Sequence, residues 1–200
     1  MGASRAGFAG IVLAGGRATR LGGRDKPGLV LWGRSLLDRT LDAVAGADPV
    51  VVVGPSRPVS REVRWTREHP VGGGPVAALA AGLEALTERV ELIAVLAADH
   101  PWLTDRTLAR LRRCLRAEAG AAGAVLVDDD GARQWLVGVW RARELRAAVP
   151  VRPEGHALRR VLSPLSPVPV PARWAEVTDV DTPEDLARAD SWVWGPSSGT

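Results

Sequence analysis

Short apolar runs recur along the chain in the pattern typical of buried strands. Valine, isoleucine, leucine and alanine dominate them, and turn residues follow several of them. The pattern predicts four strands, at Phe8–Ala14, Val50–Val53, Leu92–Ala97 and Ala124–Val127. A further run, Trp135–Trp140, follows the acidic turn Asp128–Gly131 and is expected to pair with the strand before that turn.

Between these runs, apolar residues recur every three or four positions, as they do on the buried face of a helix. The stripes are Leu37, Leu41 and Val44, then Leu79, Leu83 and Leu86, then Leu108, Leu111 and Leu115. Pro75 suits the first turn of the second helix, and Thr104 is a typical N-cap for the third. A last helix is expected after Thr182, where proline and two acidic residues follow.

Alternating strands and helices predict an α/β protein with a mostly parallel sheet. The segment Ser163–Pro171 contains four prolines, which exclude a central strand or a helix interior and predict a loop or an extended edge. No repeat or internal linker interrupts the pattern. We therefore expect one domain over residues 1–200, with its core at about 8–191 and a flexible tail at 192–200.

Composition excludes several classes of protein. With 46% apolar and 24% charged residues, the chain has enough apolar sequence for a core, which excludes a disordered protein. A single cysteine, Cys114, excludes an internal disulfide and a cysteine-based zinc site. No apolar run approaches the ~18 residues of a membrane span, and the N-terminus lacks the hydrophobic stretch of a signal peptide. We expect a cytoplasmic protein that does not bind a membrane.

The charge balance directs attention to a single residue. Twenty-six basic residues against 23 acidic ones leave a net charge of +3, which is too small to indicate nucleic-acid binding. Lys26 is the only lysine, and a compact ammonium is not interchangeable with a guanidinium in a small site. The arginines of the third predicted helix are expected on a solvated face: Arg110, Arg112, Arg113 and Arg116.

The turn after the first strand, LAGGRATRLGGRDK at 13–26, combines paired glycines with basic side chains. Glycines let backbone N–H groups approach an anion, and such a turn at the carboxyl end of a strand suits phosphates. Arg17, Arg20 and Lys26 add positive charge. The spacing matches neither the dinucleotide-binding nor the P-loop motif, and a surface loop rich in arginine is the structural alternative.

A second candidate lies at the end of the predicted strand Leu92–Ala97. Asp99 follows this strand, at the edge where α/β sheets place their ligands, and its carboxylate suits a hard cation. The alternative is a structural role in the turn or at the cap of the helix that follows.

Four segments of the chain together resemble the molybdenum cofactor guanylyltransferase family. They are residues 13–26, GGPVAAL at 73–79, ADHPWL at 98–103 and DVDTPEDL at 179–186, in the order of the family's motifs. The resemblance implies a single nucleotidyltransferase domain with a Rossmann-like three-layer α/β/α fold of the nucleotide-diphospho-sugar transferase type.

The resemblance also implies roles for individual residues. Leu13, Ala14 and Gly15 match positions that line guanine and ribose, while Gly16, Arg17, Arg20 and Lys26 belong to the phosphate-binding turn. Gly74 and Pro75 match the family's second nucleotide-site motif. Asp99 matches its magnesium-binding aspartate, and Asp181 is the candidate second carboxylate. Glu68 is the acidic residue nearest to the position at which the family reads guanine, so we nominate it for that role.

The activity implied is transfer of GMP from GTP to the terminal phosphate of molybdopterin, with Mg²⁺ as cofactor and release of pyrophosphate. Lys26, Arg20 and Asp99 would be its catalytic residues. Proteins that mature molybdoenzymes are possible further partners. The alternatives are a cytidylyltransferase that acts on molybdopterin or on a sugar or alcohol phosphate, and a non-catalytic nucleotide-binding homologue.

Overall fold

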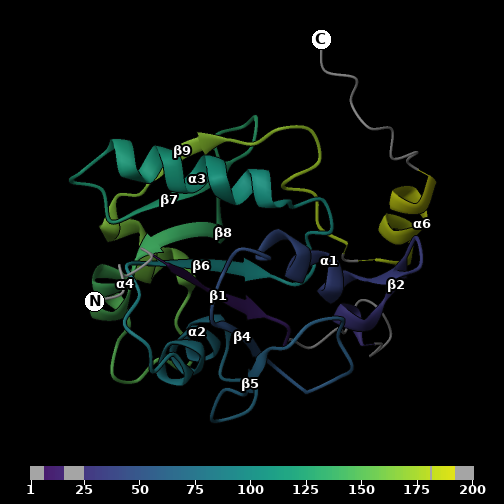
Figure 1. The fold of residues 1–200 in the computed structure, drawn as a ribbon, viewed down its shortest axis with the longest axis horizontal. Coiled ribbons are helices and arrows are strands. Elements are labelled where there is room, and N and C mark those ends of the chain that lie inside the picture. The colour runs from purple at the N-terminus through teal and green to yellow at the C-terminus, as the bar shows by residue number, and fades with distance from the viewer. Residues whose placement is uncertain (1–6, 16–24, 181, 192–200) are drawn as a thin grey trace, which may run out of the picture.

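The computed structural model describes residues 7–15, 25–180 and 182–191. Seven strands form one sheet in the order β5-β4-β1-β6-β8-β7-β9. Their bounds are β1 Phe8–Leu13, β4 Val50–Val53, β5 Arg64–Thr66, β6 Leu92–Ala97, β7 Gly123–Val127, β8 Arg133–Arg141 and β9 Val168–Pro171. Only β8 runs against the other strands of this sheet, because its pairings with β6 and β7 are antiparallel and the rest are parallel. The arrowheads of β1 and β6 point to the right in Figure 1.

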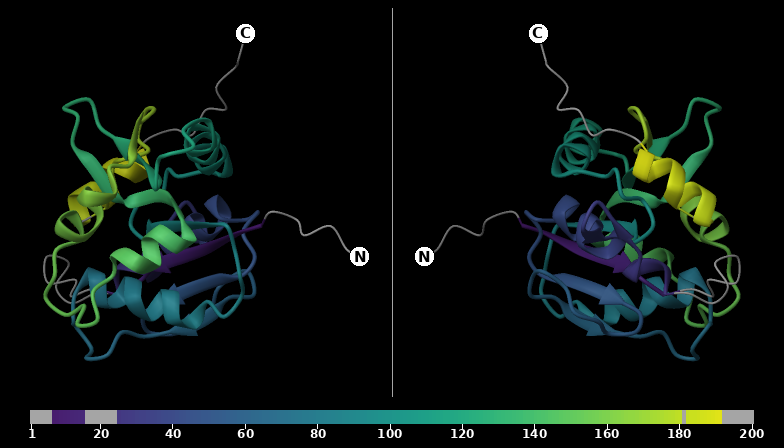
Figure 2. Two further views of the ribbon diagram at one scale, coloured as in Figure 1. Left: turned by 90° about the vertical axis from the view of Figure 1, so that its left-hand side faces the viewer. Right: turned by 90° about the vertical axis from the view of Figure 1, so that its right-hand side faces the viewer.

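The helices cover both faces of the sheet, as the end-on views of Figure 2 show. Their bounds are α1 Leu36–Ala43, α2 Pro75–Ala85, α3 Asp105–Ala117, α4 Ala142–Ala148, α5 Leu158–Leu162 and α6 Pro183–Ser191, with short 3₁₀ turns η2 Lys26–Gly28 and η3 Ser163–Leu165. One core cluster packs α1 and α3 against one face, and a second packs α2, α4 and α5 against the other. The predicted α/β/α arrangement is confirmed.

A two-stranded hairpin precedes α1. It consists of β2 Val30–Leu31 and β3 Arg34–Ser35, and its two-residue turn has positive φ at both Trp32 and Gly33. Positive φ at both turn residues is typical of the tight hairpins whose twist matches the strands. The hairpin contacts α6 at the right-hand end of the molecule (Figure 1).

Two side-chain caps, of which Thr104 was predicted, explain where helices α1 and α3 begin. The Ser35 side chain accepts a hydrogen bond from the backbone N–H of Asp38, and Thr104 forms a reciprocal capping box with Thr107. Each such cap contributes about 1 kcal/mol by satisfying a backbone donor that the helix leaves unpaired. The predicted starts of the second and third helices, at Pro75 and after Thr104, are confirmed.

The proline-rich segment becomes η3 and the edge strand β9. Val168 and Val170 alternate with Pro169 and Pro171 along β9, which pairs on one side only, with β7. Because successive N–H groups of a strand point in opposite directions, alternating prolines leave the donors that face β7 intact. The predicted extended edge is therefore confirmed.

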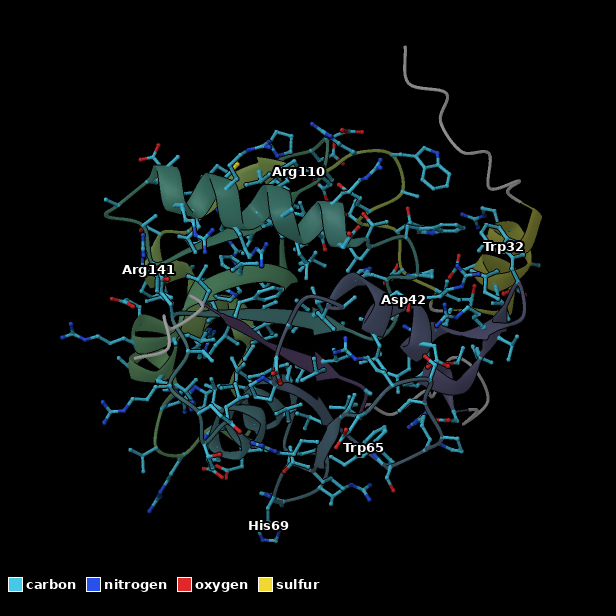
Figure 3. All side chains as sticks on the ribbon, viewed as in Figure 1. Trp32, Asp42, Trp65, His69, Arg110 and Arg141 are labelled. Atoms are coloured by element: carbon cyan, nitrogen blue, oxygen red, sulfur yellow. The ribbon has the colours of Figure 1, made fainter. Side chains whose placement is uncertain are left out.

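The predicted solvated arginine face on α3 is partly wrong. Arg113 and Arg116 are exposed, but Arg110 is buried and its guanidinium donates to the carboxylate of Glu176 at 2.5 Å (Figure 3). Arg112 lies over the Phe8 ring at 4.2 Å, and burial lowers the pKa of its guanidinium. Their long stems and planar head groups let these two side chains lie along apolar surface.

No helix among the residues that the structure describes is long and apolar enough to cross a membrane. The predicted tail at 192–200 lies outside the described residues.

Candidate nucleotide-binding and catalytic site

The candidate residues gather at the carboxyl edge of the sheet. Gly15 follows β1, Glu68 follows β5 and Asp99 follows β6, each two residues after its strand. Parallel strands end at one edge, and in α/β sheets that edge is where ligands bind. The topology thus places together three positions that are far apart in the sequence.

Backbone hydrogen bonds fix the end of β1. The N–H of Ala14 donates to the carbonyl of Val53 at 2.8 Å, and the N–H of Ala98 donates to that of Leu13 at 3.0 Å. A Cβ at Gly54 would lie 2.8 Å from the backbone carbonyl of Ala14, so only glycine permits this approach. Leu13 and Ala14 are buried and Gly15 is exposed, which leaves backbone rather than side chains at the mouth of the site.

Lys26 and Asp99 form an ion pair at the centre of this edge. The Nζ of Lys26 donates to Oδ2 of Asp99 at 2.8 Å, with side-chain exposures of 16% and 27%. The other oxygen, Oδ1, is buried and has no hydrogen-bond partner among the described residues; Nε2 of His100 lies 3.9 Å from it. The Oδ1 atom of Asp99 can therefore still accept a hydrogen bond or bind a cation.

Arg57, from the loop after β4, was not singled out in the sequence. Its guanidinium pairs with the carboxylate of Asp25, directly before Lys26, and also donates to the carbonyl of Pro55. A Cβ at Gly28 would lie 2.5 Å from the Asp25 carboxylate, so the glycine leaves room for the pair. The pair ties the segment that carries Lys26 to the loop after β4. No motif pointed to Arg57, since its partner is 32 residues away.

The Glu68 carboxylate faces the end of β1. One oxygen, Oε1, accepts from the backbone N–H of Gly72 at 3.1 Å, while Oε2 is buried and has no hydrogen-bond partner among the described residues. A Cβ built on Gly15 would lie 3.8 Å from Oε2. A carboxylate oxygen that is removed from water and left unpaired is a strong acceptor for a donor that a ligand brings.

Gly74 and Pro75 begin α2 at the same edge. Gly74 is the N-cap, with φ of 96°, and its carbonyl accepts from the N–H of Ala78 at 3.0 Å. The neighbouring Gly73 carbonyl accepts from the N–H of Gly155 at 2.9 Å, which fixes the turn against the segment before α5.

Four of the predicted site residues, Gly16, Arg17, Arg20 and Asp181, lie outside the described residues. The closing segment is nevertheless joined to the site, because the N–H of Val180 donates to the carbonyl of Asp99 at 3.1 Å. No group of three histidine, cysteine or acidic side chains in the described part of the chain has a metal-holding geometry.

Solved structures share this architecture. The molybdopterin-guanine dinucleotide biosynthesis protein A of Archaeoglobus fulgidus is 22% identical, with a TM-score of 0.67 over 91% of this chain and 96% of that one. The 2-C-methyl-D-erythritol 4-phosphate cytidylyltransferase of Thermus thermophilus is 18% identical, with a TM-score of 0.69 over 90% and 96%. These likenesses confirm the predicted Rossmann-like fold.

Relatives found by sequence indicate a narrower group of proteins than the structural neighbours do. The chain is 40% identical to the probable molybdenum cofactor guanylyltransferase of Opitutus terrae over 126 residues. The matched segment makes up 60% of this chain and 62% of that protein. It is 30% identical over 201 residues to the molybdenum cofactor guanylyltransferase of Rhodopseudomonas palustris, at 90% and 91% coverage. The chain spans between 60% and 63% of the length of the relatives it matches in Opitutus, Vibrio and Burkholderia.

A match to a protein-family model assigns the chain to a family. The model described as the MobA-like NTP transferase domain matches residues 10–169, which include most of β1, all of β6 and every described candidate residue. The chain therefore belongs to the family of MobA-like NTP transferase domains.

Proposed function

We propose that the chain transfers GMP from GTP to the terminal phosphate of molybdopterin. An oxygen of that phosphate forms a bond to the α-phosphorus of GTP, while the bond to the oxygen that bridges to the β-phosphate breaks and its electron pair leaves with pyrophosphate. Such a transfer depends on positioning and charge neutralisation. The observation that carries the proposal is the Lys26–Asp99 pair at the carboxyl edge, in a chain whose relatives are named guanylyltransferases.

The unpaired Glu68 oxygen supports guanine as the base. Guanine presents N–H donors at N1 and at its amino group, and a carboxylate accepts from both. Adenine has an acceptor at N1, and cytosine has no donor at the corresponding ring nitrogen, so either base would leave the buried Oε2 of Glu68 poorly paired. Leu13, Ala14 and Gly15 would contact the base and ribose through their backbone, since they bring no polar side chain.

The phosphates would lie between Gly15 and Lys26. Lys26 stands at the start of η2 and brings a positive charge to the centre of the edge. Gly16, Arg17 and Arg20 are proposed phosphate-binding residues on the sequence pattern alone. In the loaded site Lys26 would exchange its contact with Asp99 for the triphosphate, where it offsets the charge that develops as pyrophosphate departs.

The carboxylate oxygens of Asp99 are suitable ligands for Mg²⁺. The buried, unpaired Oδ1 is an oxygen ligand of the kind this cation prefers, and phosphate oxygens and water commonly complete its coordination. Asp99 would hold the ion, with Asp181 proposed as the second carboxylate. When bound, Mg²⁺ neutralises phosphate charge and polarises the phosphoryl oxygens. Proteins that receive the guanylylated product are proposed as partners.

The test supplies the protein with each nucleoside triphosphate, with and without molybdopterin, and measures pyrophosphate release. Release that requires both GTP and molybdopterin is expected. In a second assay GTP and CTP compete, and the product is identified by mass. A cytidylylated pterin as the main product would overturn guanylyl transfer, and nucleotide binding without pyrophosphate release would indicate a non-catalytic homologue.

A further inference from the structure

The loop after β9 contains a buried carboxylate, that of Glu176. The residue is 8% exposed, and each of its two side-chain oxygens accepts a hydrogen bond. Oε1 accepts from the Thr107 hydroxyl at 2.6 Å. Oε2 accepts from the guanidinium of Arg110 at 2.5 Å and from the backbone N–H of Arg173 at 2.7 Å. This one side chain therefore joins the loop to the first two turns of α3, where Figure 3 labels Arg110.

The same loop reaches the backbone of Asp99. In Figure 1 the segment after β9 runs to the right, toward α6, which is the side to which β1 and β6 point. There the N–H of Val180 donates to the carbonyl of Asp99 at 3.1 Å. On the other side of Asp99, the N–H of Ala98 donates to the carbonyl of Leu13 at 3.0 Å. The backbone that carries the Asp99 carboxylate is thus held between β1 and this loop.

Contacts of Glu176 complete a closed circuit around Asp99. The chain passes from Asp99 into α3, and two side chains of this helix, Thr107 and Arg110, donate to Glu176. Four residues after Glu176, Val180 binds back to Asp99. A side chain that must meet a ligand within a fraction of an ångström needs such support, because small displacements of a site residue are costly.

The loop also contacts the segment that carries Lys26. Ala175 and Val180 are almost fully buried and belong to an apolar cluster with residues of β2 and α1. Leu29 packs against this cluster, and its N–H donates to the carbonyl of Lys26 at 3.1 Å. The loop that Glu176 anchors therefore lies against the segments of both members of the Lys26–Asp99 pair.

Stability alone does not account for a carboxylate at this position. Removing two charges from water costs free energy, and well-packed apolar residues can replace a buried ion pair with little loss of stability. An apolar side chain does not supply direction, whereas a carboxylate holds its donors at set distances and angles. The donors Thr107, Arg110 and Arg173 come from α3 and from the loop, so their shared acceptor sets how these two segments lie relative to each other.

We propose that Glu176 is a positioning residue that fixes Asp99 for the cation of the transfer reaction. This inference rests on the proposed function, in which Asp99 holds the divalent cation. Glu176 acts through the loop: it fixes the loop on α3, and the Val180 N–H then holds the carbonyl of Asp99, so that the carboxylate keeps its place. Groups that orient a metal ligand commonly contribute about 10- to 100-fold to metal affinity.

The test measures the Kd of Mn²⁺, a paramagnetic substitute for Mg²⁺, from the electron paramagnetic resonance signal of the free ion. The main variant combines Arg110→Met with Glu176→Leu, because it removes the directional contacts without leaving a buried charge unpaired. It should stay folded and bind Mn²⁺ about tenfold more weakly than the wild type. Glu176→Gln, which keeps the shape of the side chain, should weaken Mn²⁺ binding in the same direction.

Arg141→Met is the matched control for a loss of stability. Arg141 donates to the carbonyls of Ala121 and Leu115 at the other end of α3, so its replacement should destabilise the protein without changing the Kd of Mn²⁺. Asp99→Asn is the reference for loss of the cation ligand itself, and it should weaken Mn²⁺ binding more than any change at Glu176.

Amide hydrogen exchange at Val180 provides a second readout that needs no cation and no substrate. The double variant should lose protection at this N–H and keep it at Ala98, which β1 holds. If Asp99→Asn binds Mn²⁺ like the wild type, the cation role in the proposed function fails, and exchange at Val180 decides whether Glu176 fixes the loop.

Two outcomes concern the positioning role directly. If Asp99→Asn is impaired but the double variant binds Mn²⁺ like the wild type, the positioning role of Glu176 is wrong. If circular dichroism shows that the double variant is unfolded, Glu176→Gln decides by the same two readouts. Absence of transfer from GTP would contradict the proposed function and would leave both readouts in force.

Discussion

The Nζ of Lys26 lies 2.8 Å from Oδ2 of Asp99, although 73 residues separate them in the chain. The pair joins the turn after β1 to the end of β6 and brings opposite charges to the centre of the sheet edge. Both groups would have to change partners when a triphosphate and a cation bind. Removing either side chain should therefore impair catalysis even though the other one remains.

Lys26→Met should lower kcat/KM for guanylyl transfer by about 100-fold or more, because it would remove the charge that we propose stabilises the departing pyrophosphate. Lys26→Arg should recover only part of the rate, since a planar guanidinium presents its charge and donors in a different geometry from a compact ammonium. Arg106→Met, which removes a charge from an exposed position of α3, is the control. Turnover near the wild-type value at saturating GTP would contradict a phosphate role for Lys26.

Asp99→Asn should weaken Mg²⁺ affinity and lower the rate together. The amide keeps the shape of the side chain but would remove the charge that we propose holds a hard cation, so higher Mg²⁺ should restore part of the activity. The measurement is initial rate against Mg²⁺ concentration, with Glu84→Gln on the exposed face of α2 as the matched control. An unchanged Mg²⁺ profile would return Asp99 to a structural role.

Arg110→Met should lower the free energy of unfolding by about 3–5 kcal/mol, because it leaves the buried Glu176 carboxylate without its cation. Replacing both partners, as Arg110→Met with Glu176→Leu, should cost less than the single change. Arg113→Met, on the exposed side of the same helix, should change stability by no more than about 0.5 kcal/mol. Urea denaturation measures all three, and a single variant as stable as the wild type would show that the pair contributes nothing.

The spacing of apolar residues predicted the strands and helices that carry a clear buried face in their own sequence. The strands β4 and β6 have the predicted bounds, and the three predicted helix stripes lie in or directly after α1, α2 and α3. The short strand β5, with the sequence Arg-Trp-Thr, was missed because three residues are too few for a pattern and two of them are polar. Its pairing with β4, rather than its composition, makes it a strand.

The positions of the candidate site residues were predictable where a motif lies beside a strand, and their long-range contacts were not. Lys26 and Asp99 were identified from loop chemistry, yet nothing in the sequence indicated that they pair. Arg57 and Glu176 were not identified, because each acts through a partner that only the fold brings near. Arg110 of α3 was misassigned for the same reason: a buried carboxylate lies within its reach, and a helical pattern alone contains no sign of it.

Glu68→Gln should reduce the preference for GTP over CTP. A carboxylate can accept from both donors of guanine, whereas one end of an amide is itself a donor and would oppose the guanine amino group. Since a hydrogen bond to a charged group contributes about 1.5–3 kcal/mol, the affinity for GTP should fall by roughly 10- to 150-fold, with much less change for CTP. Glu62→Gln, at an exposed position before β5, provides the control. The measurement is the Kd for each nucleotide together with the product ratio when GTP and CTP compete. Equal losses for GTP and CTP would mean that Glu68 supports the turn through Gly72 and does not read the base.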